Sequence, residues 1–399
     1  MGVMSYILEK RPKRLIYLDH SASTPIDSRV LKAMMPFLAE QYGNPSGLHS
    51  QARALASALD RARTEVAEVL GCKPKEVIFT SCGTESDNLA IRGIAFSAAR
   101  AGKGQHIITS ACEHHAVSHT IKHLCEHFGF QQTVVPVDRY GLIDPADVKR
   151  AIRSDTVLIS VIYANNEIGT IQPLAEIGEI GRQLGIPVHT DAVQAGGYLD
   201  LNVDRLRVDL LSLSGHKFYA PKGVGVLYVR EGIPLLPQQT GGGHEGGRRA
   251  GTENVPYIVG LATALKLAQD IRSVENGRLI QLRDRLIRGV QAALPDAQLT
   301  GHPTQRLPHH ASFVIPGVDA STLLMHLDLA GICAASGSAC NTGMSEPSSI
   351  LLAMGIPPQL ALGALRLTLG RSTTMDDIET VLEVLPTIVE RLRTTHPNE

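Results

Sequence analysis

The sequence predicts an α/β protein with a mainly parallel seven-stranded sheet and a second, smaller α+β domain. Two observations predict this fold class. Over the first two-thirds of the chain, short apolar runs typical of buried strands alternate with longer amphipathic patterns typical of helices. Near Gly241 this alternation stops, and a different mixture of helical and strand patterns continues towards the C-terminus.

Seven short apolar runs in the first part are predicted strands. In chain order they are "LIYLD", "EVIFTS", "QHIITS", "TVLISVIYA", "IPVHTD", "DLLSLS" and "GVGVLYV". Helical patterns lie between them at Ser50–Leu70, Glu85–Ala101 and Leu174–Leu184. Because helices connect parallel strands, we expect helices on both faces of the sheet and ligands at the carboxyl ends of the strands.

The segment "TGGGHEGGRRAGTEN" marks the change of pattern. Its glycines and paired arginines predict an irregular loop that approaches a ligand or a partner closely. A helical pattern then runs from about Asn254 to Ala293, and we expect the domain boundary inside it. Residues 15–262 would form the large domain, and residues 1–14 and 263–399 the small one. There, "ASFVIPG" and "ALRLTLG" are predicted strands and "DDIETVLEVLPTIVERLR" is the predicted closing helix.

Composition and charge argue against several classes of protein. The 399 residues are 43% hydrophobic, which is ordinary for a globular protein, and the 38 basic and 39 acidic residues nearly cancel. This balance does not favour nucleic acid or an anionic membrane as a direct partner. The N-terminus lacks the apolar core of a signal peptide, so we expect a cytoplasmic protein. The six cysteines form no CxxC pair, so no metal site is expected.

Three groups of polar residues follow predicted strands, where a ligand of the sheet would bind. Lys217 follows "DLLSLS" on a Ser-Gly-His turn, a suitable place for a lysine that forms a Schiff base with pyridoxal phosphate. Asp191 ends "IPVHTD" in the apolar middle of the sheet, so its carboxylate needs a cationic partner such as a protonated pyridine nitrogen. Gly83 and Thr84 begin a helix, and their backbone N–H groups could hold a phosphate.

Each of these groups also has an ordinary structural interpretation. Lys217 could be a surface cation with a packed aliphatic stem. Asp191 could cap the next helix, and Gly83 could belong to a helix start that binds nothing. The interpretation as a cofactor site therefore depends on the convergence of three strand ends on one ligand.

Cys340 lies in "AASGSACNTGMSEPSS", among residues too small to bury a thiol. A structural cysteine normally has apolar neighbours. We therefore expect an exposed loop in which Gly337 and Gly343 permit movement, so that a reactive thiol can reach a buried substrate and then an outside acceptor. The alternative is a reduced cysteine with no chemical role.

Ten motifs, in order along nearly the whole chain, make the sequence resemble the pyridoxal-phosphate-dependent cysteine desulfurases of the NifS/IscS type, in the class-V aminotransferase family. They are "YLDHSASTP", "GNPSGLHS", "FTSCGTESDN", "EHHAV", "NNEIGT", "HTDAVQ", "SLSGHKFYAPKGVG", "GGGHEGGRRAGTEN", "SGSAC" and "LRLTLGR". Such an ordered set is far more specific than a single glycine motif. The resemblance implies a fold-type I transferase that binds pyridoxal 5'-phosphate, acts on L-cysteine and forms a homodimer.

The resemblance also implies a role for each matching residue. Lys217 would bind the cofactor covalently, His114 would stack on its ring and move protons, and Cys340 would accept the sulfur. Arg366, with Asn166, would bind the substrate. The other cofactor ligands would be Asp191 at the ring nitrogen, and Asn166 and Gln194 at the ring oxygen. The phosphate would be held by Gly83, Thr84, Ser214 and His216 of the same chain, together with the partner subunit's Thr252.

The implied reaction converts L-cysteine to L-alanine and leaves a persulfide on the loop cysteine. A sulfur-acceptor protein, either an iron–sulfur scaffold or a factor for thio-modification of tRNA or DNA, would then receive the sulfur. A selenocysteine lyase, an aminotransferase or a non-catalytic sulfur carrier of the same fold are the alternatives. An aminotransferase has no use for the loop cysteine, and the presence of Lys217 and Asp191 argues against a non-catalytic carrier.

The sequence departs from the family pattern at a few positions. His20 stands where relatives often have asparagine, Ser21 where alanine is usual, and Cys82 where glycine or alanine is usual. The Thr-Ser that often follows the loop cysteine is also missing. These departures leave the chemical groups of the site in place and bear on substrate preference and rate.

Overall fold

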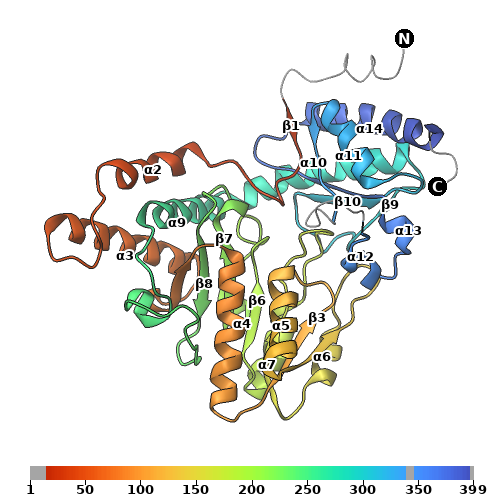
Figure 1. The fold of residues 1–399 in the computed structure, drawn as a ribbon. Coiled ribbons are helices and arrows are strands. Elements are labelled where there is room, and N and C mark those ends of the chain that lie inside the picture. The colour runs from red at the N-terminus through yellow and green to blue at the C-terminus, as the bar shows by residue number, and fades with distance from the viewer. Residues whose placement is uncertain (1–14, 338–345, 396–399) are drawn as a thin grey trace.

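A seven-stranded sheet runs through the larger part of the molecule (Figure 1). The structure is a computed structural model, which describes residues 15–337 and 346–395. In spatial order the strands are β2 (Val77–Thr80), β8 (Gly225–Val229), β7 (Leu210–Ser214), β6 (Val188–Asp191), β5 (Thr156–Ser160), β3 (His106–Ser110) and β4 (Gln131–Val135). β8 is antiparallel to both of its neighbours, and the other pairs are parallel. The predicted mainly parallel sheet is therefore confirmed.

One member of this sheet differs from the prediction. The segment "LIYLD" contributes only β1 (Ile16–Tyr17), which pairs in parallel with β11 (Ile332–Cys333) outside the large sheet. The seventh strand is instead β4, at the sheet edge. Its sequence "QQTVV" is mostly exposed, so it lacks the apolar run by which the other strands are recognised.

Helices cover both faces of the sheet. α4 (Gly83–Arg100) and α5 (His115–Phe128) pack on one face, while α3 (Ser50–Leu70), α7 (Leu174–Leu184) and α9 (Val255–Asp270) share a core with the other. The alternation of side chains along a strand explains this: Ile78 packs with α4 and α5, whereas its neighbours Val77 and Phe79 pack on the opposite side. The same part of the chain contains α2 (Ser28–Ala39), α6 (Pro145–Ala151), α8 (Val203–Leu206) and 3₁₀ turns at Pro74–Glu76, Gly215–Lys217 and His244–Gly247.

A second hydrophobic core lies in the part of the molecule that carries the C-terminus (Figure 1). It surrounds a three-stranded antiparallel sheet with the order β12 (Ala364–Thr368), β10 (His310–Val314) and β9 (Gln298–Leu299). The helices here are α10 (Arg272–Ala293), α11 (Ala320–Leu329), α12 (Ser349–Ala353), α13 (Pro358–Ala361) and the closing helix α14 (Met375–Thr395). None of the helices within the described ranges is long and apolar enough to span a membrane.

The helical pattern predicted from Asn254 to Ala293 is two consecutive helices. α9 ends at Asp270 and α10 begins at Arg272, because the backbone of Ile271 has a ψ of 0°. Apolar residues of α9 belong to the core of the large sheet, and those of α10 belong to the second core. The domain boundary inside this segment stays a prediction.

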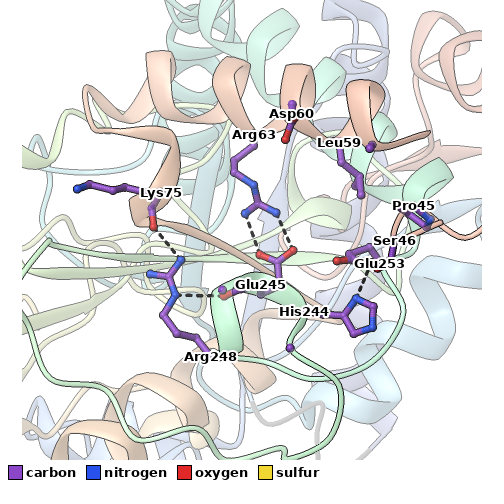
Figure 2. Close-up of a pocket in the computed structure, with 13 residues that line it drawn as sticks. Pro45, Ser46, Leu59, Asp60, Arg63, Lys75, His244, Glu245, Arg248 and Glu253 are labelled. Atoms are coloured by element: carbon purple, nitrogen blue, oxygen red, sulfur yellow. Dashed lines mark hydrogen bonds and ion pairs between the residues drawn. The ribbon is translucent and has the colours of Figure 1, made fainter. Parts of the chain in front are cut away.

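Glu245 fixes the glycine-rich loop to the large sheet (Figure 2). Its buried carboxylate accepts two hydrogen bonds from Arg63 of α3, at 2.8 and 2.7 Å, and one from the backbone N–H of Phe79 in β2, at 2.9 Å. Farther along the loop, Arg249 pairs with Glu85 in the first turn of α4 at 2.7 Å. A loop that the sequence predicts to be irregular is therefore held by two ion pairs.

We expect Glu245→Ala to lower the free energy of unfolding by roughly 3 kcal/mol, because it leaves the mostly buried Arg63 guanidinium without its anion. Urea unfolding followed by circular dichroism measures this loss. Glu231→Ala is the matched control: Glu231 pairs with Lys73 and Lys75 in an exposed position, so its removal should have little effect. Equal destabilisation by both changes would contradict the anchoring role of Glu245.

Candidate active site

A cavity of about 250 Å³ lies where the carboxyl ends of β6 and β7 meet the starts of α4 and α5. Most of the site residues predicted from the sequence line it. The lining consists of Cys82, Gly83, Thr84, Asp87, His114, Ile162, Asn166, Asp191, Val193, Gln194, Ser214, His216 and Lys217. A larger hollow of about 540 Å³ surrounds Glu245 (Figure 2), but Arg63 and His244 there are already paired with carboxylates.

Lys217 ends the 3₁₀ turn that follows β7, and its amine is held by carbonyl groups. Its Nζ donates hydrogen bonds to the backbone oxygens of Ser21 and Ala22, at 2.5 and 2.9 Å. The amide Nε2 of Gln194 donates to the same Ser21 oxygen at 2.9 Å. The segment after β1 therefore orients two of the residues that line the cavity.

Asp191 is a buried carboxyl group at the end of β6. Its Oδ1 accepts a hydrogen bond from the N–H of Val193 at 2.9 Å. Burial, and next the negative charge of Asp87, raise the pKa of Asp191 to about 7. A cation bound in the cavity beside Asp191 would offset the free-energy cost of burying the ionised carboxylate. Asn166 presents a second unsatisfied group, since its buried Oδ1 has no hydrogen-bond partner in the described part of the chain.

His114 lines the cavity and also caps α5. Its Nδ1 accepts a hydrogen bond from the backbone N–H of Ala116 at 3.1 Å, so the ring proton belongs on Nε2. Burial lowers the pKa of His114, which favours the neutral imidazole. A neutral ring with one free N–H can stack on an aromatic ligand and exchange a proton with it.

The start of α4 provides an anion cradle. Gly83 is the first residue of this helix, and a Cβ atom there would lie 2.7 Å from Val193 Cγ2 and 3.3 Å from Ser214 Cβ. Only glycine fits without a shift, and its backbone N–H points out of a helix N-terminus. Cys82 caps the helix, because its Sγ accepts the N–H of Glu85 at 3.4 Å. This contact gives the unusual cysteine a structural role.

His216 contributes a neutral ring beside the cradle. Burial, and next the positive charge of Lys217, lower the pKa of His216 to about 4. Its Nδ1 lies 3.3 Å from the hydroxyl of Ser23. Together with the glycine at the helix start and the buried Asp191 carboxyl, this ring belongs to a set of groups that fits a cofactor with a phosphate and a protonated ring nitrogen.

Three predicted site residues do not line the cavity. Arg366 lies beside it in β12: its guanidinium donates to the Asn166 carbonyl at 3.0 Å and pairs with Asp19 at 2.9 Å, and its buried Nε has no partner within the described ranges. Thr252 is exposed and lines a separate hollow with Arg249 and Glu245. Cys340 lies outside the described residues.

Sequence reasoning missed a group of buried titratable residues next to Asp191. Burial raises the pKa of Asp87 to about 7 and that of Glu113 to about 8. His189 lies between the serines of β5 and β7, with 2.8 Å to Ser160 Oγ and 3.0 Å to Ser212 Oγ. Burial lowers the pKa of His189 to about 4, so its 3.5 Å contact with Asp87 joins a carboxyl to a neutral imidazole.

A sequence signal exists for one of these residues only. Asp87 follows Gly83 by one helical turn, so both lie on the same face of α4. Nothing in the local pattern distinguishes Glu113 or His189 from exposed polar residues, because their burial depends on strand order.

Lys217 follows β7, the buried carboxyl of Asp191 ends the neighbouring strand β6, and the start of α4 lies beside both strand ends. This arrangement defines a fold-type I site, and the similarity to known proteins agrees with it. The aminotransferase class-V family model matches residues 16–381. A cysteine desulfurase IscS from Methanosarcina thermophila is 49% identical over 96% of this chain and 94% of its own. A solved NifS-like protein has a TM-score of 0.89 and 36% identity, over 94% of this chain and all of that one. The chain of SspA in complex with cysteine has a TM-score of 0.76 and 35% identity, over 89% of this chain and 98% of its own.

The chain therefore belongs to the class-V aminotransferase family, and within it to the cysteine desulfurases.

We expect Asp87→Asn to stabilise the cofactor-free protein more at high pH than at low pH. The pKa of Asp87 is about 7 in the folded state, against 3.8 for an ordinary aspartate. The folded state therefore holds this proton more tightly than the unfolded chain, and stability is lost as the pH rises from 3.8 towards 7. An asparagine has no charge to bury, so the variant escapes this loss.

Thermal unfolding at pH about 5 and about 8 measures the difference between parent and variant. Asp60→Asn serves as the control, because it makes the same chemical change at an exposed position. A difference for Asp87→Asn that is independent of pH would contradict the buried-carboxyl account.

Proposed function

We propose that this protein is a cysteine desulfurase that uses pyridoxal 5'-phosphate to convert L-cysteine to L-alanine and passes the sulfur to Cys340. The observation that carries this proposal is the convergence of Lys217, Asp191 and His114 on one cavity, in a chain of the cysteine desulfurase family. The orphaned and buried polar groups of that cavity support the cofactor assignment.

Each residue of the cavity has a part in holding the cofactor. Asp191 binds the protonated ring nitrogen, and His114 stacks on the ring. Bound pyridoxal phosphate supplies an electron sink for the electron pair that remains when the substrate Cα loses its proton. The other ligands are Asn166 and Gln194 at the ring oxygen, and Gly83, Thr84, Ser214 and His216 at the phosphate.

Lys217 acts as the base that removes this proton. Its neutral amine is suited to the task, and the carbonyls of Ser21 and Ala22 keep it at the cavity wall. Arg366 binds the substrate carboxylate with the N–H groups of its guanidinium, next to Asn166. His114 Nε2 moves protons between substrate and product.

Cys340 takes the sulfur as a thiolate. The bond between Cβ and sulfur of the substrate breaks while a bond forms between this sulfur and Sγ of Cys340, and Cβ gains a proton to give alanine. Cysteine and an enzyme thiol thus yield alanine and an enzyme persulfide, with no outside oxidant or reductant. Because the acceptor must be a reduced thiol, the proposal includes a cytoplasmic location.

The proposal also includes a homodimer in which the partner subunit's Thr252 completes the phosphate site. Thr252 is exposed in its own chain, on a loop that two ion pairs hold in place. Pro45 and Ser46 lie beside the same loop. In the sequence they stand between Tyr42 and Leu48, whose side chains are among the most exposed large apolar groups described.

The proposal further includes a partner that receives the sulfur. The persulfide on Cys340 would be passed to an acceptor protein of iron–sulfur assembly or thio-modification.

We expect Lys217→Ala to abolish both the visible absorbance of bound cofactor and the formation of alanine from cysteine, because Lys217 is the one lysine among the described residues that line the cavity. Absorbance spectra of the purified protein and an alanine assay measure the two losses. Lys222→Ala, an exposed lysine five residues on, is the control and should keep both properties. A Lys217→Ala protein that kept its colour and activity would overturn the assignment of the site.

We expect Cys340→Ala to separate cofactor chemistry from sulfur transfer. Cysteine should still change the visible spectrum, because the cavity is intact, while alanine formation falls by roughly three orders of magnitude or more with the nucleophile gone. Cys333→Ala, a half-buried cysteine in β11, is the control and should keep the parent rate. Alanine formation by Cys340→Ala at the parent rate would show a direct lyase reaction instead.

A further inference from the structure

Four histidines follow one another along α5 at intervals of four residues. They are His115, His119, His123 and His127. Because residues four apart lie on one face of an α-helix, the four imidazoles form a row that begins at the active-site end of the helix. His115, His119 and His127 are exposed and His123 is half-buried, so hydrophobic packing does not account for the row.

The first two members are arranged as a pair. The rings of His115 and His119 are stacked, with 4.6 Å between their centroids and 7° between their planes. Neither ring takes part in any hydrogen bond or ion pair within the described part of the chain. Lys122 and Glu126, which are exposed on the same helix, form an ion pair with each other at 3.7 Å. Their charged groups are therefore not paired with the imidazoles of His115 and His119.

We propose that His115 and His119 form a surface binding site for a divalent transition-metal ion of the zinc, nickel and copper class. Two histidines at i and i+4 on one helix face are a recurring chelate for such ions, and imidazole is a ligand that they prefer. Both side chains are exposed, so rotation about their side-chain bonds can turn the rings out of the stack and bring one nitrogen of each to a common ion.

The ion would have two protein ligands and complete its coordination with water. No group of three or more histidine, cysteine or acidic side chains is arranged to hold a metal ion in the described ranges, so a closed structural site is not available there. Neither His115 nor His119 lines the cavity that holds Lys217, so the metal site is separate from the cofactor site. It is close to it, because the ring of His114, which does line the cavity, lies 6.2 Å from that of His115.

Equilibrium dialysis of the cofactor-loaded protein with Ni²⁺ tests this proposal, because nickel favours imidazole and does not oxidise thiols as copper does. We expect His115→Asn/His119→Asn to bind one nickel ion per chain fewer than the parent. His119→Asn/Lys32→His keeps the number of imidazoles but moves the second one to an exposed position on α2, so it should lose the same ion. The visible absorbance of the cofactor, unchanged in both variants, verifies that the fold is intact.

Nickel binding by either variant equal to that of the parent would overturn the proposal, because the ion would then lie at other groups, such as thiols or the imidazoles of His123 and His127. Anomalous scattering from parent crystals soaked in Ni²⁺ provides a check that needs no variant. A peak bonded to both His115 and His119 supports the site, and a peak only at other residues contradicts it.

Discussion

A carboxyl group buried inside the sheet is the constraint on which the active site depends. Asp191 ends β6 in a region where Asp87 and Glu113 are also fully buried, and burial raises the pKa of all three groups. Few neighbouring groups compensate a negative charge here: His189 is held neutral by the same burial. A ligand that brings a positive charge to Asp191 is therefore favoured over water, which is the property that a pyridinium-binding site requires.

Two segments that are distant in the sequence position other residues of the site. The backbone after β1 gives its carbonyls to Lys217 and Gln194, and β12 brings Arg366 to the carbonyl of Asn166. Both β1 and β12 belong to the second core. The contacts between the two cores thus set the distance between Lys217, the proposed base, and the Arg366 guanidinium, which is proposed to bind the substrate.

The sequence predicts the parts of this arrangement that have a local signal. Buried strands and amphipathic helices have periodic patterns, so α3 and α7 have the predicted bounds, and polar residues at strand ends identify Lys217 and Asp191. Edge strand β4 and the break at Ile271 lack such patterns, because exposed strands need no apolar run and a single backbone angle ends α9. Glu113 and His189 could not be predicted, since their burial arises only when β3, β5, β6 and β7 assemble.

The central claim is that sulfur leaves cysteine at this site and is carried by the cysteine in the glycine-rich C-terminal segment. Mass spectrometry of the peptide that contains Cys340, after a single turnover with sulfur-labelled L-cysteine and blocking of free thiols, tests it most directly. The account predicts that this peptide gains one labelled sulfur atom for each alanine formed, and that a reductant removes it. Label found only as free sulfide, or on the peptide of another cysteine while Cys340 stays unmodified, would contradict the account.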